Sequence, residues 1–345
     1  MKNMQILLKV TVFLIAVSVL FLGCAGKAAA KGANQTQTEE TTRSAEITQT
    51  GNPPVSGDVN INANVYFTND ISSAGLMAVY QALGLQASGN VAVKLHSGEP
   101  GNTHFLKPDL IKDLVQRVNG TIIEANTAYG GRRASTAAHY QVAQDHGFTA
   151  IAPFVILDEK ADISIPVTGG KRLKENFVGA RFNEFDFHIV LSHFKGHQMG
   201  GFGGALKNLS IGYASTAGKN WIHTAGRSKT SMSGGNQDAF LESMAEAAKS
   251  IVDSTGGKIL YINVMNHLSV DCDCNGRPAQ PTMADIGILA SLDPVALDQA
   301  CIDLVYSAPD SRDLIQRIES RNGLLTIEHA AAIGVGSKTY RLIEL

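Results

Sequence analysis

The stretch "DFHIVLSHFKGHQMGGFGGALKNL", residues 186–209, is the part of the sequence that indicates the fold class most directly. Residues 186–193 form a short apolar run with β-branched side chains, which is typical of a buried strand. The glycine-rich segment that follows favours a loop, and "GALKNL" at 204–209 can open a helix. A strand that passes through a loop into a helix indicates an α/β protein.

The same alternation continues on both sides of this stretch, from residue 61 to the end of the chain. Helices are predicted at 107–118, 238–253 and 293–306, the last with Asp293 as N-cap and Pro294 at its first position. We therefore predict an α/β fold, a mostly parallel Rossmann-like sheet with flanking helices in a single large domain over 61–345. Its predicted strands are 64–67, 90–96, 120–126, 148–154, 186–193, 258–265 and 285–291.

The first 60 residues differ from the rest. Two lysines precede an apolar run that ends at Cys24, which predicts a signal peptide of the lipoprotein type over 1–24. The alternative is a plain signal peptide cleaved near the alanines at 28–30. Residues 25–60 carry few large apolar side chains and are predicted to be a disordered tether. We expect an exported protein on the outer face of the cell membrane or in the periplasm, attached to the membrane only through a lipid on Cys24.

The charge of the chain limits its partners. Its 345 residues hold 29 Lys and Arg against 31 Asp and Glu, a net charge of -2. This balance lacks the basic excess typical of nucleic-acid binding. We expect no nucleic-acid partner and a small-molecule or anionic ligand instead.

Ionisable side chains gather where the predicted strands end, in segments 94–102, 124–132, 192–201 and 266–274. In open parallel sheets, ligands bind beyond the carboxyl ends of the strands. We expect these segments to face one crevice. The candidates for catalysis there are His193, His197, His96 and Glu99. A structural role for the pair of histidines at 193 and 197 remains the alternative.

The glycine-rich segment is a candidate for binding an anion or a cofactor. Closely spaced glycines let backbone N–H groups approach a ligand, and a helix start adds favourable dipoles. The segment matches neither the P-loop nor the dinucleotide fingerprint, so a mobile loop is the alternative. The residues concerned are Gly200, Gly201, Gly203, Gly204, Lys207 and Asn208.

The cysteines form a third candidate site. With Cys24 assigned to the signal, Cys272, Cys274 and Cys301 remain, an odd number for an exported protein. Three thiolates could bind a metal or complete part of an iron-sulfur cluster. A disulfide between Cys301 and one of the other two, or three inert thiols, are the alternatives.

Several segments resemble a known family in the same order. They are "VAVKLHSGEPGNTHFLKP" (91–108), "EANTAYGGRR" (124–133), "SHFKGHQMGGFGGALKNLSIG" (192–212), "DCDC" (271–274) and "DIGILASLDPVALDQACIDL" (285–304). They are similar to domain of unknown function family 362, whose members are often labelled iron-sulfur centre proteins. Many relatives carry a ferredoxin-like insert with two four-cysteine runs, whereas residues 220–237 here contain no cysteine. A cluster implied by the resemblance would therefore depend on the three cysteines named above.

Two functions of different class follow from these patterns. The first is a redox or metal-dependent enzyme, with a metal or iron-sulfur site at the carboxyl ends of the strands. The second is an extracytoplasmic protein that binds an anion or a small metabolite without catalysis.

Overall fold

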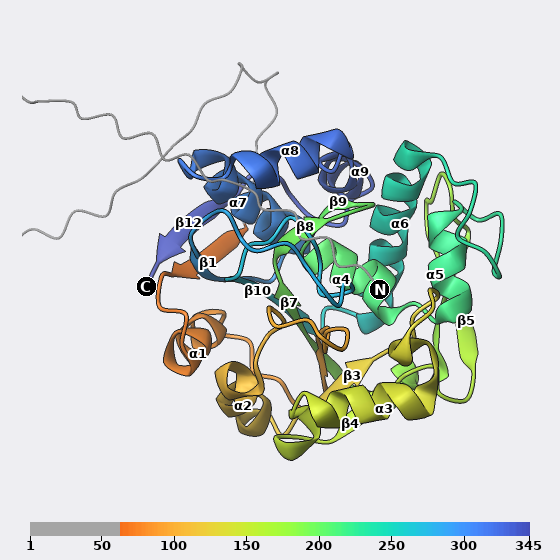
Figure 1. The fold of residues 1–345 in the computed structure, drawn as a ribbon, viewed down its shortest axis with the longest axis horizontal. Coiled ribbons are helices and arrows are strands. Elements are labelled where there is room, and N and C mark those ends of the chain that lie inside the picture. The colour runs from red at the N-terminus through yellow and green to blue at the C-terminus, as the bar shows by residue number, and fades with distance from the viewer. Residues whose placement is uncertain (1–62) are drawn as a thin grey trace, which may run out of the picture. The chain divides into compact units, whose positions relative to one another are not determined.

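The computed structural model describes residues 63–345, drawn in colour in Figure 1. In this part of the chain the largest sheet has eight strands, in the order β12-β1-β11-β10-β7-β2-β3-β4. Neighbours from β10 to β4 are parallel, and β11 runs antiparallel to β1 and β10. The predicted α/β fold with a mostly parallel sheet is confirmed. The strands of this sheet are β1 (Asn64–Thr68), β2 (Val91–Lys94), β3 (Thr121–Glu124), β4 (Phe154–Ile156), β7 (Phe187–His193), β10 (Ile259–Met265), β11 (Gly287–Ser291) and β12 (Arg341–Glu344).

Helices cover both faces of this sheet (Figure 1). One apolar cluster joins α1 and α2 to one face, and a second joins α4, α6 and α7 to the other. Both clusters are built from side chains that alternate along the same strands, because successive strand residues point to opposite faces. The helices are α1 (Ser73–Ala82), α2 (Pro108–Arg117), α3 (Thr136–Asp145), α4 (Ala205–Tyr213), α5 (Thr216–His223), α6 (Gln237–Thr255), α7 (Pro294–Ser307), α8 (Arg312–Ser320) and α9 (Leu325–Ala332).

Strand β7 lies in the middle of the sheet and is buried along its whole length. Lys94 at the end of β2 pairs with Val190 of β7 and with Ile123 of β3. The carboxyl ends of these parallel strands therefore open on the same edge of the sheet, which is where the polar segments were expected to meet.

The predicted helix signals of α7 are confirmed. The Asp293 carboxylate accepts hydrogen bonds from the amides of Val295 and Ala296 at 2.8 and 2.9 Å, and Pro294 occupies the first turn. These bonds satisfy amides that have no partner inside the helix.

The strand predicted at 148–154 is wrong in most of its length. Phe148–Ala150 forms a short 3-10 helix, and only Phe154 lies in a strand. Gly147 has a φ of 86°, so the chain turns sharply after α3 before the apolar residues begin. Phe148 is buried in the core by this turn, and its apolar character had favoured a strand.

The glycine-rich segment is also more regular than the predicted loop. β8 (Lys195–His197) and β9 (Gly201–Gly203) pair as an antiparallel hairpin that leads directly into α4. Gly201 supplies the positive φ, 80°, at the start of β9.

The predicted signal peptide and tether lie outside the described residues, and the domain boundary at residue 61 stays a prediction. No helix within residues 63–345 is long and apolar enough to cross a membrane.

Candidate functional site

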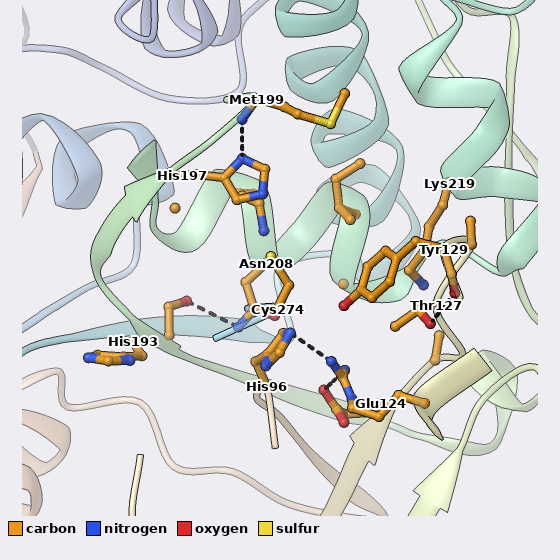
Figure 2. Close-up of a pocket in the computed structure, with 18 of the residues that line it drawn as sticks. His96, Glu124, Thr127, Tyr129, His193, His197, Met199, Asn208, Lys219 and Cys274 are labelled. Carbon is orange, nitrogen blue, oxygen red and sulfur yellow. Dashed lines mark hydrogen bonds and ion pairs between the residues drawn. The ribbon is translucent and has the colours of Figure 1, made fainter. Parts of the chain in front are cut away.

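A cavity of about 300 Å³ lies at the carboxyl ends of β2, β3 and β7, with walls completed by the β8–β9 hairpin, α4 and α5. Figure 2 shows side chains from several of these elements pointing toward it. Five of the lining side chains are cations and only one, Glu124, is a carboxylate. The cations are Lys94, Arg133, Lys195, Lys207 and Lys219.

Arg133 organises one wall. It is 2% exposed, and its guanidinium contacts Glu124 at 2.8 Å, Glu99 at 3.1 Å and His96 Nε2 at 2.9 Å. Burial raises the pKa of Glu124, but Arg133 and His139 outweigh it and hold that pKa well below its ordinary value. Two of the predicted catalytic residues, His96 and Glu99, are therefore engaged by the protein itself.

A second ion-pair network surrounds Asp273. Its carboxylate accepts from Lys195 Nζ at 2.5 Å and contacts His193 Nδ1 at 3.0 Å. His193 Nε2 faces the carbonyl oxygen of Asn266 at 2.6 Å. Both ring nitrogens of His193 are therefore engaged within the protein, and this histidine orients the Asp273 carboxylate.

The remaining three lysines have no carboxylate within ion-pair distance among the described residues. Lys94 donates to the Leu95 carbonyl at 2.6 Å and to Asn208 Oδ1 at 3.1 Å, and Lys219 donates to the Ala214 carbonyl. Burial lowers the pKa to about 7 for Lys94 and to about 8 for Lys219.

Lys207 is the least satisfied of the three. Within residues 63–345 its ammonium has neither a hydrogen bond nor an ion pair, and the side chain lines the cavity. Burial first and the neighbouring Lys195 second lower the pKa of Lys207 to about 7. An anion placed in the cavity would stabilise its charged form.

His197, predicted as a catalytic residue, lies at the opposite wall. Its Nδ1 accepts the backbone N–H groups of Met199 at 3.2 Å and Gly200 at 2.8 Å. Burial and Lys207 hold the pKa of His197 well below its ordinary value, so the ring is neutral. Since Nδ1 is the acceptor, the ring hydrogen is on Nε2.

The cysteines are arranged differently from the prediction. Cys272 and Cys274 form a disulfide with each other, a pairing that was not among the expected alternatives. Cys301 is buried on α7, where Asn263 Nδ2 lies 3.4 Å from its sulfur. The expected site of three thiolates is therefore not formed, and neither is a disulfide to Cys301, because helix α7 holds that sulfur in the apolar core.

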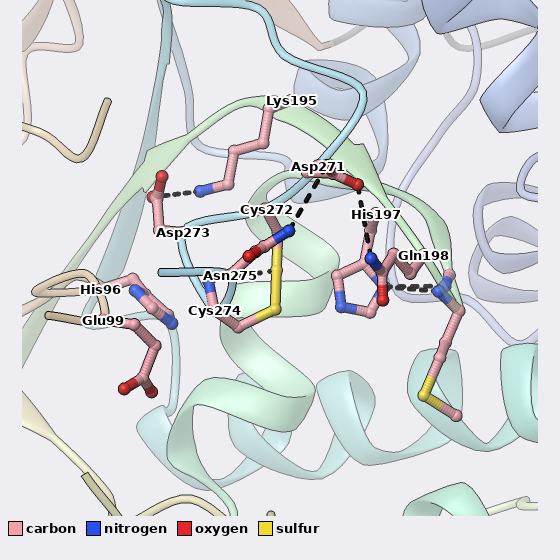
Figure 3. Close-up of a disulfide and its surroundings, with 12 residues drawn as sticks. His96, Glu99, Lys195, His197, Gln198, Asp271, Cys272, Asp273, Cys274 and Asn275 are labelled. Carbon is pink, nitrogen blue, oxygen red and sulfur yellow. Dashed lines mark hydrogen bonds and ion pairs between the residues drawn. A yellow bond between two sulfur atoms is a disulfide. The ribbon is translucent and has the colours of Figure 1, made fainter. Parts of the chain in front are cut away.

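The disulfide adjoins His197 (Figure 3). Ligand atoms of His197, Cys272 and Cys274 lie within 4.8 Å of one another, so this group could hold a metal once the disulfide is reduced. The family resemblance implied an iron-sulfur cluster. The described residues do not fit one, since only two cysteines lie together and they are bonded to each other.

The glycines predicted to cradle an anion divide into two pairs, and their role stays a prediction. Gly203 and Gly204 line the cavity, whereas Gly201 packs against the backbone of Ile318 and Gly323, away from it. Gly200 lies at the tip of the same hairpin and does not line the cavity either.

The start of α4 already has an anion. The Asp298 carboxylate accepts from the amides of Ala205 at 2.7 Å and Leu206 at 2.9 Å, and from Asn263 at 2.8 Å. Burial raises the pKa of Asp298 to about 6. The helix N-terminus thus serves the fold, and an external anion must use the lysines.

Asn208 connects α4 to the sheet. Its amide donates to the carbonyls of Lys94 and Leu191 and to Ser192 Oγ, at 3.1–3.2 Å. It therefore holds the cavity walls together. Because Asn208 also lines the cavity, its role in binding a cofactor stays a prediction.

Sequence reasoning missed Arg133, Lys219 and Asp273 as site residues. Arg133 and Asp273 stand inside quoted motifs, but neither has a spacing that identifies a partner. Lys219 lies on α5, a helix that was not predicted. Each of the three is a charged side chain in a buried part of the chain. The sequence alone does not show that these parts are buried.

Comparison with known proteins identifies the family. No curated protein matches the chain. Among solved structures, it is similar to the lactate racemase apoprotein from Thermoanaerobacterium thermosaccharolyticum, with 15% identity, a TM-score of 0.35, and coverage of 61% of this chain and 52% of that one. It is also similar to a Thermotoga maritima protein, with 15% identity, a TM-score of 0.38, and coverage of 75% and 58%. The chain thus spans little more than half of each, and we draw no functional conclusion from either. A family model matches residues 91–303, and the chain belongs to the family described as "Domain of unknown function (DUF362)".

Proposed function

We propose that this protein is a redox enzyme that binds a small carboxylate- or phosphate-bearing molecule in the cavity. The observation that carries the proposal is the set of three lysines, Lys94, Lys207 and Lys219, that line the cavity and have no carboxylate partner within residues 63–345. The cavity volume of about 300 Å³ suits a small metabolite.

The energetics favour an anionic ligand. A pKa lowered to about 7 means that the protein itself disfavours the charge on Lys207. A ligand carboxylate or phosphate beside this ammonium would remove that cost. Arg133 cannot serve the same purpose because Glu124 and Glu99 already occupy its guanidinium.

Chemistry in the same cavity favours an enzyme over a binding protein. Cys274 lines the cavity wall, and the neutral ring of His197 lies next to it. A protein that only binds an anion has no need of a disulfide facing its ligand. The binding protein remains the alternative, and it predicts that the ligand leaves the disulfide unchanged.

A metal-dependent enzyme is the second candidate, because His197, Cys272 and Cys274 are close enough to share an ion. Metal-binding histidines normally donate a hydrogen bond from the nitrogen that does not bind the metal. In His197 that pattern is reversed, since Nδ1 accepts two amides. This arrangement favours a redox enzyme over a metal-dependent enzyme. If the reduced protein binds one zinc ion per chain and His197→Ala does not, the metal-dependent enzyme is favoured instead.

Calorimetric titration with malonate and with inorganic phosphate at pH 6.5 tests the proposal. We expect one site per chain. In Lys207→Met the affinity should fall about ten-fold or more, since a hydrogen bond to a charged group contributes about 1.5–3 kcal/mol. The matched control is Lys112→Met, which removes an exposed lysine on α2. Absence of binding, or equal affinity in both variants, would reject the lysine site.

We also propose that the protein is exported and anchored by a lipid on Cys24, which the sequence pattern supports. Incorporation of labelled palmitate should depend on Cys24. If Cys24→Ser protein is labelled and fractionates with membranes as the wild type does, the anchor is elsewhere.

A further inference from the structure

Of the two cysteines in the disulfide, one lines the cavity. Cys274 is among the lining residues, whereas Cys272 is 3% exposed and is not. Thiol–disulfide exchange proceeds by in-line attack on a single accessible sulfur. A thiolate in the cavity therefore meets Cys274, and Cys272 is the leaving group.

The surroundings of Cys272 suit a leaving thiolate. The backbone N–H of Cys274 points to Cys272 Sγ at 3.3 Å, and a charge on that sulfur would strengthen this bond. Figure 3 shows the His197 ring beside the disulfide, with Lys195 and Asp273 on the other side. Because Nδ1 of His197 is held by backbone amides, its Nε2–H is the ring's available donor toward sulfur.

The lysines lie in the same cavity as Cys274. Lys207 and Lys219 line it, and neither has a carboxylate partner among the described residues. A thiol that also carries an anionic group could place that group on the lysines and its sulfur at Cys274. A neutral thiol has no charged group that could bind to these lysines.

From these contacts we infer that the Cys272–Cys274 disulfide exchanges with small thiols that carry a carboxylate, phosphate or sulfonate group. This rests on the proposed function and names the substrate class of the same site. The substrate thiolate forms a bond with Cys274 Sγ, the bond between the two cysteines breaks, and its electron pair remains on Cys272 Sγ. A second thiolate attacks the substrate sulfur of the mixed disulfide and releases Cys274 as a thiolate. In sum, two thiols are oxidised to one disulfide, and Cys272 and Cys274 are reduced to two thiols with uptake of the two substrate protons.

The first test compares two probes that share a two-carbon chain, 2-mercaptoethanesulfonate and 2-mercaptoethanol. The oxidised full chain is mixed with each probe, free thiols are alkylated, and mass spectrometry counts the reduced cysteines. We expect the anionic probe to react at least about ten-fold faster at pH 6.5, where Lys94 and Lys207 are mostly charged, because a cationic site raises the local anion concentration by roughly 10–10³. This preference should shrink in Lys207→Met and persist in Lys112→Met.

The second test identifies the sulfur that is attacked. Each single-cysteine variant is incubated with the symmetric disulfide of 2-mercaptoethanesulfonate, and the adduct is located by peptide mapping. We expect Cys272→Ser to form a mixed disulfide at Cys274 and Cys274→Ser to form little at Cys272, because Cys272 is buried.

Equal rates for the two probes, or an adduct mainly on Cys272, would overturn this inference. If malonate still binds in a manner that depends on Lys207, the anion site of the proposed function would survive that result. If malonate binding is also absent, both proposals fail.

Discussion

Replacing Lys207 by Met should weaken anion binding and stabilise the protein at the same time. The pKa of Lys207 is lowered from 10.5 to about 7. A shift of that size corresponds to an upper bound of about 5 kcal/mol of charge destabilisation. Part of the side chain faces the cavity and the site can relax, so we expect a gain of about 1–2 kcal/mol in the free energy of unfolding.

The lowered pKa of Lys207 determines how the stability difference between wild type and Lys207→Met changes with pH. Below pH 7 the folded protein holds the charged lysine, and the full cost is present. Between pH 7 and 10.5 the unfolded chain binds more protons than the folded one, so wild-type stability rises relative to the variant as pH increases. Urea unfolding at pH 6.5, 8 and 9.5 should show the advantage of Lys207→Met shrinking along this series. A variant that is less stable than the wild type at pH 6.5 would refute the reasoning, because Lys207 would then stabilise the fold.

Three further predictions concern the framework of the site. Asp298→Ala should cost about 3 kcal/mol or more in urea unfolding, since three buried donors lose their acceptor; a loss below about 1 kcal/mol would contradict the capping role. Gly204→Ala should also lower the melting temperature, because the added Cβ would collide with the Asp298 carboxylate; an unchanged melting temperature with normal binding would show that the chain adjusts at no cost. Cys301→Ala should leave the rate of thiol exchange unchanged and cost about 1–2 kcal/mol, since this sulfur packs in the core; a large change in the exchange rate would place Cys301 in the redox site.

The fold could be predicted where burial alone decides the structure. β7 and β10 are buried on both faces, so their sequences are continuous apolar runs, and the predicted bounds differ from the observed ones by one residue. α7 carries Asp293 and Pro294 at its start, and both act locally. The strand predicted at 148–154 is wrong because the apolar side chain of Phe148 packs in the core from a turn that follows Gly147.

The site could be predicted in part. Parallel strands end at one edge, so His96, His193 and Cys274 were expected to converge, and all three line the cavity. Which charges pair, however, depends on the path of long loops. Asp273 reaches His193 across 80 positions of the chain. The loop that carries Asp273 also contains the Cys272–Cys274 disulfide, whereas Cys301 lies apart on α7.

The central claim is that a half-buried lysine, Lys207, receives an anion in the cavity. The most direct test is the proton uptake that accompanies malonate binding at pH 8, measured by calorimetry in two buffers of different ionisation enthalpy. With a pKa of about 7, Lys207 is about 90% neutral in the free protein at that pH. Malonate should recharge it, so we predict net proton uptake on binding, with about one proton fewer taken up in Lys207→Met. Malonate binding without proton uptake, or with the same uptake in both proteins, would contradict the account.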